Sequence, residues 1–218
     1  MASSETAIRI AALCLDGRGR LSKRLLCSTA VRAGLLVDLA LAGRLEETAG
    51  SIELDDSPTG VVPLDQMLWS VSQAPGTTLD AWLQFPRPTL RDLAEEALRT
   101  LRWELHRGLS PGIRFLDSEA LRTAADRARE PGNASADWTP ADVAVTAIAE
   151  VTGLRRAVTA PGSWYVDEPA EPLGAALLAA TGSLRWLVTA SAEHLAWARA
   201  RDAADAVSLR SSGTVGPG

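Results

Sequence analysis

The chain has 218 residues, of which 46% are hydrophobic and 22% are charged. This length and composition are typical of a globular protein with a buried core, and they exclude a disordered chain, a fibre and a small disulfide-rich scaffold. The net charge is −5, yet residues 1–37 carry six basic and two acidic side chains. We therefore expect no general nucleic-acid binding, but one local basic face that suits an anionic surface.

The sequence predicts a cytoplasmic protein. Its longest apolar run, residues 172–184, is followed by Arg185 and is shorter than the about 20 apolar residues that a membrane-spanning helix needs. The N-terminal residues lack the layout of a signal peptide. The two cysteines, Cys14 and Cys27, do not make a disulfide framework, and we expect both to be buried as small apolar residues.

The first half of the chain predicts helices around one β-hairpin. Residues 6–15 are apolar and predict a short helix, and residues 16–19 predict a turn. Residues 22–42 repeat an apolar stripe at helical spacing and end at Gly43. Residues 44–63 combine alternation with turn residues and predict a β-hairpin. Residues 64–71 return to helical spacing, with Trp69 expected in the core.

Residues 90–107 form the clearest predicted helix. Thr89 and Asp92 make a capping box before it, an apolar stripe runs through it, and Gly108 follows it. Trp103 lies off that stripe and is predicted to be an interface residue.

Further helices are predicted after this one. Thr139 and Pro140 predict the N-cap and first residue of a helix through residue 151. Other helices are expected at residues 117–129, 173–190 and 192–207. The fold class is therefore mainly α, with one domain over residues 1–207, a small β-hairpin and a disordered tail at residues 208–218.

The sequence contains no recognisable catalytic or metal-binding motif. The two histidines, His106 and His194, have no cysteine or carboxylate at metal-ligand spacing, so we predict no metal site. No phosphate loop or nucleophile elbow is present, so we predict no cofactor and no enzyme activity. The aspartates Asp55, Asp56 and Asp65 are candidates for an acid pair or a cation site, although such residues more often cap turns.

Arg99 and Arg102 are the strongest basic signal. On the predicted helix they are three residues apart and share one side. Two guanidinium groups at that spacing suit a phosphate, which they bind with paired hydrogen bonds. Arg99 also has Glu95 and Glu96 as helical neighbours, whereas Arg102 has no acidic neighbour on the helix. The spacing leaves a solvated surface and an anion site both open.

Four blocks in order resemble the Golgi phosphoprotein 3 family. Residues 30–45 resemble its signature helix, which reads roughly LRGC followed by ELALRGRL. The other blocks are the turn at 16–20, the DSPTG segment with its following Leu64 and Asp65, and residues 98–105. Beyond about residue 116 only the helical pattern is compatible. The chain looks like a divergent, bacterial member.

The resemblance implies a function at membranes. Members of the family are mainly helical with a small β element. Its eukaryotic members are peripheral cytosolic proteins that bind phosphatidylinositol 4-phosphate on Golgi membranes and retain glycosyltransferases by their cytoplasmic tails. Their head-group pocket uses an arginine of the signature helix, matched here by Arg32, and two later arginines, matched by Arg99 and Arg102. A tryptophan of that pocket falls on Lys23 or Arg24, which keeps the positive charge but loses an apolar wall.

Two departures from the family pattern lead to structural expectations. Lys23 and Arg32 would lie on opposite faces of one continuous helix, so a shared head group predicts a helix break near Cys27 and Ser28. The family's membrane-inserting apolar hairpin is reduced here to residues 108–116, which predicts shallow insertion. Its apolar side chains are Leu109, Ile113, Phe115 and Leu116.

The sequence leaves three functions open. The first is a peripheral membrane adaptor that binds a phosphoinositide or another anionic head group through Arg32, Arg99 and Arg102, aided by Lys23 or Arg24. The second is a protein–protein scaffold of the same fold that has lost lipid binding. The third is a small-molecule enzyme that uses the same basic pocket, for which no acid, base or nucleophile accompanies the arginines.

Overall fold

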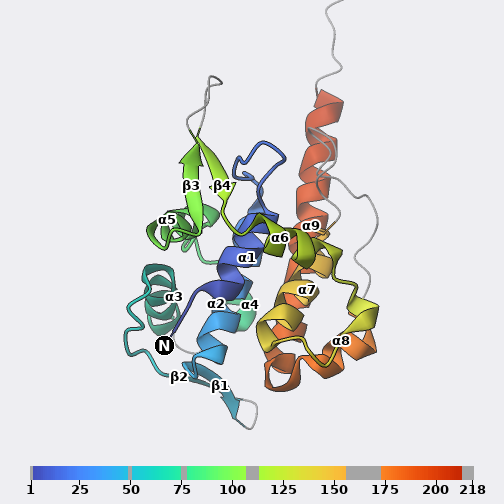
Figure 1. The fold of residues 1–218 in the computed structure, drawn as a ribbon. Coiled ribbons are helices and arrows are strands. Elements are labelled where there is room, and N and C mark those ends of the chain that lie inside the picture. The colour runs from blue at the N-terminus through green and yellow to red at the C-terminus, as the bar shows by residue number, and fades with distance from the viewer. Residues whose placement is uncertain (1, 49–50, 75–77, 107–112, 156–172, 213–218) are drawn as a thin grey trace, which may run out of the picture.

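A computed structural model describes residues 2–48, 51–74, 78–106, 113–155 and 173–212, with side chains described as far as residue 204. Over these residues the chain is mainly α-helical and has two separate antiparallel strand pairs, as Figure 1 shows. The mainly α fold predicted from the sequence is therefore confirmed.

The first half of the chain contains five helices and one strand pair among the described residues. In order these are α1 (Glu5–Leu13), α2 (Leu25–Leu41), β1 (Leu45–Thr48), β2 (Ser51–Leu54), α3 (Val62–Ser72), α4 (Leu79–Leu83) and α5 (Leu90–Arg99). The second half begins with another strand pair. Its elements are β3 (Trp103–His106), β4 (Arg114–Asp117), α6 (Ala120–Ala128), the 3-10 turn η1 (Pro131–Asn133), α7 (Pro140–Thr152), α8 (Ala175–Ala180), the 3-10 turn η2 (Gly182–Leu184) and α9 (Arg185–Ser212).

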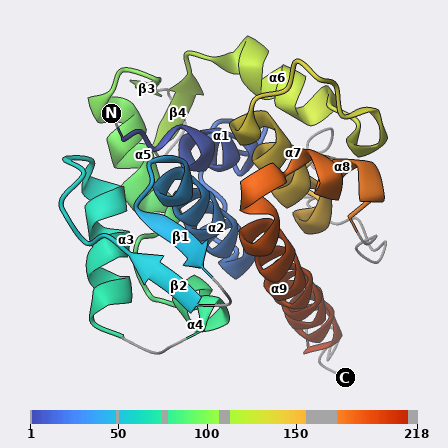
Figure 2. The same cartoon turned by 90° about the horizontal axis from the view of Figure 1, so that it is seen from below.

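The core lies where α1 and α2 pack on each other and on α7 and α9. Its centre consists of fully buried aliphatic side chains, including Ile10, Leu13, Leu35 and Leu36. Burial of this apolar surface is the main source of stability. Seen from below in Figure 2, α9 crosses beside α2 and then extends away from the body.

The two hairpins lie at opposite ends of the molecule, with β1–β2 at the bottom of Figure 1 and β3–β4 at the top. In the lower pair Leu45 faces Leu54 and Glu46 faces Glu53. In the upper pair Trp103 faces Asp117 and Leu105 faces Phe115. Surfaces on these two hairpins are therefore far apart and can serve separate roles.

Most predicted elements of the first half are confirmed. The helices at 6–15, 22–42 and 64–71 correspond to α1, α2 and α3, and the hairpin at 44–63 corresponds to β1–β2. Asp16 accepts hydrogen bonds from the backbone N–H groups of Arg18 and Arg20, as expected of a turn. Cys14 and Cys27 are buried and not joined by a disulfide.

The predicted capping motifs are also confirmed. Thr89 with Asp92 and Thr139 with Asp142 both form complete capping boxes, and Pro140 occupies the first turn of α7. Asp65 accepts hydrogen bonds from the backbone N–H and the hydroxyl of Thr59, so it stabilises the turn before α3. Asp65 therefore has the turn-capping role that the sequence analysis weighed against a cation site.

Three predictions were wrong, two on the burial of tryptophans and one on where a helix ends. Trp69 is 66% exposed on α3 rather than in the core, because its helix covers the core only with its other face. Trp103 is buried against Phe115, with ring centroids 5.5 Å apart, and is not an interface residue. The helix predicted at 90–107 ends at Arg99, since Leu101 adopts a left-handed backbone with φ of 59°.

The C-terminal region also differs from the prediction. The break predicted near residue 191 lies earlier, at η2, and α9 runs without interruption from Arg185 to Ser212. Residues 208–212 therefore belong to a helix and not to a disordered tail. The rest of that predicted tail, residues 213–218, lies outside the described residues.

Candidate functional site

Arg32 lies in the middle of α2 and is buried. Its guanidinium donates hydrogen bonds to the carbonyl oxygens of Leu83 (2.7 Å) and Pro88 (3.3 Å) and to the hydroxyl of Thr29 (3.2 Å). Burial lowers the pKa of Arg32 to about 10. All of these partners are neutral oxygens, and among the described residues no carboxylate forms an ion pair with Arg32.

Arg99 is the last residue of α5 and is exposed. Its Nε and Nη2 donate to the two carboxylate oxygens of Glu96 at 2.9 and 2.6 Å, and these bonds raise the pKa of Arg99. Glu96 itself is buried. An anion that binds Arg99 must therefore compete with a neighbouring carboxylate.

Arg102 lies between α5 and β3, not on the helix of Arg99. Its Nη1 is 3.6 Å from an Oε2 of Glu119, which precedes α6. Arg102 thus has an acidic neighbour, Glu119, that comes from another segment and not from its own helix turn. The expectation that Arg99 and Arg102 share one side of one helix was wrong, because the helix ends between them.

The structure does not bring Arg32 together with the later arginines. Arg32 contacts Pro88 just before the first turn of α5, whereas Arg99 ends that helix. Ten helical residues separate these positions by about 15 Å along the helix axis. The contacts of Arg32 therefore lie at the start of α5, and those of Arg99 lie at its end.

Lys23 and Arg24 lie in the segment that connects α1 to α2. Arg24 is the N-cap residue of α2 and has an extended backbone, and Lys23 before it is exposed. The helix continues unbroken through Cys27 and Ser28, so the predicted break there was wrong. No break is needed, because both basic residues lie outside the helix.

The β3–β4 hairpin carries an exposed apolar surface. Its exposed side chains, including the one just before β3, are Leu101 (81%), Leu105 (52%), Ile113 (61%) and Leu116 (50%). Ile113 and Leu116 were predicted to offer apolar surface, and Leu109 lies outside the described residues. Phe115 was predicted likewise but is buried beneath the hairpin against Trp103.

The loop that follows α1 holds this hairpin in place. The backbone N–H of Phe115 donates to the carbonyl oxygen of Gly19 at 2.7 Å. Gly19 has φ of 71°, and a Cβ there would lie 2.3 Å from the Phe115 carbonyl oxygen, so only glycine fits. This contact places the loop that carries Arg18 beside β4, the strand that begins at Arg114.

The sequence did not identify Arg18, Arg114 or Leu101 as parts of one surface. Each belongs to a different segment, and the segments of Arg18 and Arg114 are joined by the hydrogen bond between Gly19 and Phe115. Gly17 and Gly19 predict the turn, but the sequence does not indicate that this turn contacts β4. Within the described part of the chain, no cluster of three or more His, Cys, Asp or Glu residues could hold a metal ion.

A comparison with protein families matches residues 11–214 to Golgi phosphoprotein 3 (GPP34). The chain belongs to the Golgi phosphoprotein 3 family. The match covers nearly the whole chain, including the region after residue 116 where the sequence motifs had ended. No curated protein matches the chain. Among the described residues of this Golgi phosphoprotein 3 family member, no helix is long and apolar enough to cross a membrane.

Proposed function

We propose that the chain is a peripheral adaptor that docks on an anionic membrane surface through the end that carries β3–β4. Family membership supports the adaptor role at a coarse level. The observation that supports the docking end is the coincidence of exposed leucine and isoleucine side chains with basic side chains on adjacent segments. In this proposal the cargo is the cytoplasmic tail of a membrane-bound protein such as a glycosyltransferase.

The apolar side chains supply shallow insertion. Leu105 and Ile113 lie near the described ends of the two strands, on the face that Trp103 and Phe115 occupy closer to the body. Each buried methylene group favours insertion by about 0.8 kcal/mol. A few partly inserted side chains give weak, reversible attachment, which suits a peripheral protein.

The basic side chains supply attraction to anionic lipid. Arg18 and Lys23 are exposed on the loop after α1, and Arg114 lies on β4. Each basic residue near an anionic leaflet contributes about 1 kcal/mol, and salt screens this attraction. Arg24, Arg99 and Arg102 lie on adjoining segments and are proposed to add to it.

A phosphorylated head group is the finer part of the proposal. Arg32 supports it, because a buried guanidinium whose partners in the described part of the chain are neutral oxygens favours a nearby anion. Since Arg32 contacts Pro88 just before α5 and Arg99 ends that helix, we propose that the head group contacts Arg32 or the pair Arg99 and Arg102, not all three at once.

The second candidate function is a protein–protein scaffold without lipid binding. The ion pairs of Arg99 with Glu96 and of Arg102 with Glu119 favour it, because they occupy these arginines within the chain. The exposed leucines of the hairpin would then contact a protein partner.

Sedimentation with vesicles separates the two functions. The vesicles are neutral, doped with phosphatidylserine, or doped with phosphatidylinositol 4-phosphate at equal total charge. The variants are Leu105→Ser/Ile113→Ser, Arg99→Ala/Arg102→Ala and Arg32→Lys, which keeps the charge but loses the paired donors. The control Val62→Ser/Trp69→Ser removes exposed apolar side chains from α3 instead.

The membrane proposal predicts binding to both anionic vesicles, a loss of about tenfold in the hairpin variant and no loss in the α3 control. A preference for the phosphoinositide that disappears in one arginine variant would support the head-group site. Absence of binding to every vesicle would contradict the proposal and favour the scaffold.

A further inference from the structure

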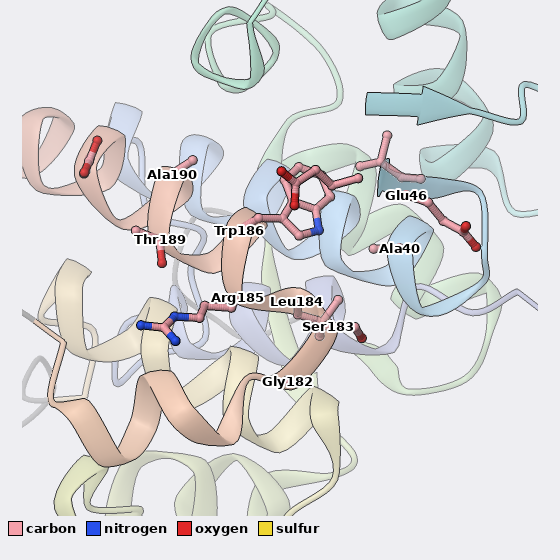
Figure 3. A pocket seen from close by; sticks show the side chains of 12 residues that line it. Ala40, Glu46, Gly182, Ser183, Leu184, Arg185, Trp186, Thr189 and Ala190 are labelled. Atoms are coloured by element: carbon pink, nitrogen blue, oxygen red, sulfur yellow. The ribbon is translucent and has the colours of Figure 1, made fainter. Parts of the chain in front are cut away.

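The two thiols of the chain, Cys14 and Cys27, lie outside the acidic cleft of the molecule. That cleft has a volume of about 830 Å³ and opens between the end of α2 with β1 on one side and η2 with the start of α9 on the other (Figure 3). Its rim carries Glu46, Glu47 and Glu193, and no cysteine or histidine is among the described residues that line it. The thiols lie instead where α1 meets α2.

The fold brings these two cysteines together. Cys14 is the C-cap residue of α1, and Cys27 lies in the first turn of α2. Both side chains are fully buried and share a hydrogen bond, although residues 15–26 separate them in the sequence. The N–H of Ser22 donates to the carbonyl oxygen of Cys14 and closes the connecting loop. Two reduced thiols are therefore held side by side at a junction of two core helices.

The surroundings of the two thiols differ. The hydrogen bond with Cys14 lowers the pKa of Cys27, a hydrogen bond with Ser22 and the positive charge of Arg24 add to this effect, and burial and Asp202 oppose it. Burial instead raises the pKa of the Cys14 thiol. One thiol of the pair thus favours the thiolate, which is the nucleophile, and the other keeps its proton. This is the arrangement of an attacking and a resolving cysteine.

The side chains around Cys27 are closer to solvent than Cys27 itself. Ser22, which is hydrogen-bonded to Cys27, is half-buried, as is Arg24, and Lys23 between them is exposed. An oxidant nearly as small as water, such as hydrogen peroxide, can pass Ser22, whereas a bulky thiol reagent cannot. Access therefore selects for a small oxidant.

We propose that Cys14 and Cys27 form a site of reversible oxidation, at which hydrogen peroxide converts the two thiols into a disulfide. The Cys27 thiolate attacks one peroxide oxygen, the O–O bond breaks, and the leaving hydroxide takes up the proton that Cys27 released and departs as water. The sulfur of Cys14 then attacks the resulting sulfenic acid, and its proton leaves with the sulfenic oxygen as a second water. The two thiols lose two electrons, which reduce the peroxide.

The disulfide closes the loop of residues 15–26. This loop carries Gly19, whose carbonyl oxygen accepts the hydrogen bond from Phe115 of β4. A cross-link over a loop of this length restricts the unfolded chain and should raise the thermal midpoint by about 5 °C. The inference concerns a covalent site and does not depend on membrane docking.

Oxidation of the full, reduced chain in the folded state tests the proposal. Hydrogen peroxide is the oxidant, intact mass and titration of free thiols follow the reaction, and dimedone traps sulfenic acid. The variants Cys14→Ala and Cys27→Ala separate the roles of the two cysteines. Ser22→Ala removes the hydroxyl next to Cys27, and Ser28→Ala, at the serine that follows Cys27, is its matched control. Circular dichroism checks that each variant is folded.

We expect the wild type to lose both thiols and two hydrogen atoms, to remain one chain in mass, and to recover both thiols with dithiothreitol. Dimedone should label Cys14→Ala at Cys27 and label Cys27→Ala at least about tenfold more slowly. Ser22→Ala should slow the oxidation by about threefold, and Ser28→Ala by less than about 1.5-fold.

Four results would overturn the proposal. A folded wild type that keeps both thiols, in peroxide that oxidises the urea-unfolded chain, would show that the pair is inert. A disulfide between two chains would show that the two thiols do not resolve each other. Faster dimedone labelling of Cys14 than of Cys27 would reverse the assigned roles. Equal rates in the two serine variants would remove the role of the Ser22 hydroxyl and with it the activation of Cys27.

Discussion

Asp38 shows how one buried carboxylate links α2 to the start of α1. Its two oxygens accept hydrogen bonds from the backbone N–H groups of Thr6 and Ala7, both at 2.9 Å. These N–H groups belong to the first turn of α1, where no intrahelical acceptor exists. Burial nevertheless dominates and raises the pKa of Asp38 to about 7, and repulsion from Glu5 adds to the rise.

This pKa predicts a pH dependence of stability. The folded state holds the proton of Asp38 up to about pH 7, whereas the unfolded chain releases it near 3.8. The free energy of unfolding should therefore fall as the pH rises from about 4 to about 7. Urea unfolding across this window should show the fall in the wild type and its loss in Asp38→Asn. An equal slope in both proteins would contradict the assignment.

Arg9 is the buried cation that joins α1, α6 and α7. It donates to Asp126 at 2.6 and 2.9 Å and to Asp142 at 2.7 Å. Burial opposes ionisation of Asp142, but hydrogen bonds from Thr139 and the charge of Arg9 lower the pKa of Asp142 to about 2. Arg9 and Asp142 are therefore both charged at neutral pH.

Removal of the arginine should be strongly destabilising. Arg9→Met leaves Asp126 and Asp142 with Arg129 as their remaining partner, which costs about 3 kcal/mol in the free energy of unfolding. Arg122→Met is the matched control, because Arg122 pairs with Glu5 at the partly exposed surface and its loss costs under about 1 kcal/mol. Similar costs in chemical denaturation would show that the buried network is not a main contributor.

At the scale of elements, two helix ends explain both a correct and a wrong prediction. At the end of α2, Gly43 has φ of 67°, its N–H donates to the Ala40 carbonyl and the Arg44 N–H donates to that of Leu39. At the end of α5, Leu101 and Arg102 donate in the same pattern to Leu98 and Ala97. This is the usual glycine-ended helix terminus, with leucine in the glycine position.

The sequence signals the first end and hides the second. Gly43 marks the left-handed residue, so the end of α2 could be predicted. Leu101 continues the apolar spacing of α5, so the prediction ran on to Gly108 and missed β3. The prediction that Arg99 and Arg102 share one side of a helix was wrong for the same reason. A left-handed leucine is imposed by the pairing of β3 with β4, a contact between segments that local spacing does not encode.

The leucine at this helix end predicts a stabilising substitution. Leu101→Gly relieves the left-handed strain, which exceeds the entropy cost of glycine, and should raise the free energy of unfolding by about 0.5–1 kcal/mol. Leu116→Gly removes an equally apolar exposed side chain from β4 and should instead lower it by about the same amount. Thermal unfolding of the two variants compares them directly. A lower midpoint for Leu101→Gly would contradict this account.

At the scale of the whole molecule, charge and apolar surface are separated along its length. The β3–β4 end combines exposed leucines with Arg18, Lys23 and Arg114, while the β1–β2 end exposes carboxylates. Those carboxylates are Glu46, Glu47, Glu53, Asp55 and Asp56. In the proposed docking, this separation would orient the molecule on an anionic surface, with the β1–β2 end on the far side.

The sequence predicted this polarity only in part. The basic count of residues 1–37 predicted a local basic face for an anionic surface, whereas the shortened apolar segment at 108–116 predicted only shallow insertion and favoured the scaffold. The acidic cleft had no sequence signal, because its two walls, at residues 40–47 and 182–193, are more than a hundred residues apart and meet only through the packing of α2 against α9.

The most direct test of the account is to ask which end touches the membrane. An environment-sensitive fluorophore is attached to Leu105→Cys or, at the opposite end, to Glu47→Cys, since Cys14 and Cys27 are buried and not accessible to the label. Anionic vesicles should shift the emission of the label at position 105 to shorter wavelength and leave that at position 47 unchanged. Equal shifts at both positions, or a shift at position 47 alone, would contradict docking through β3–β4.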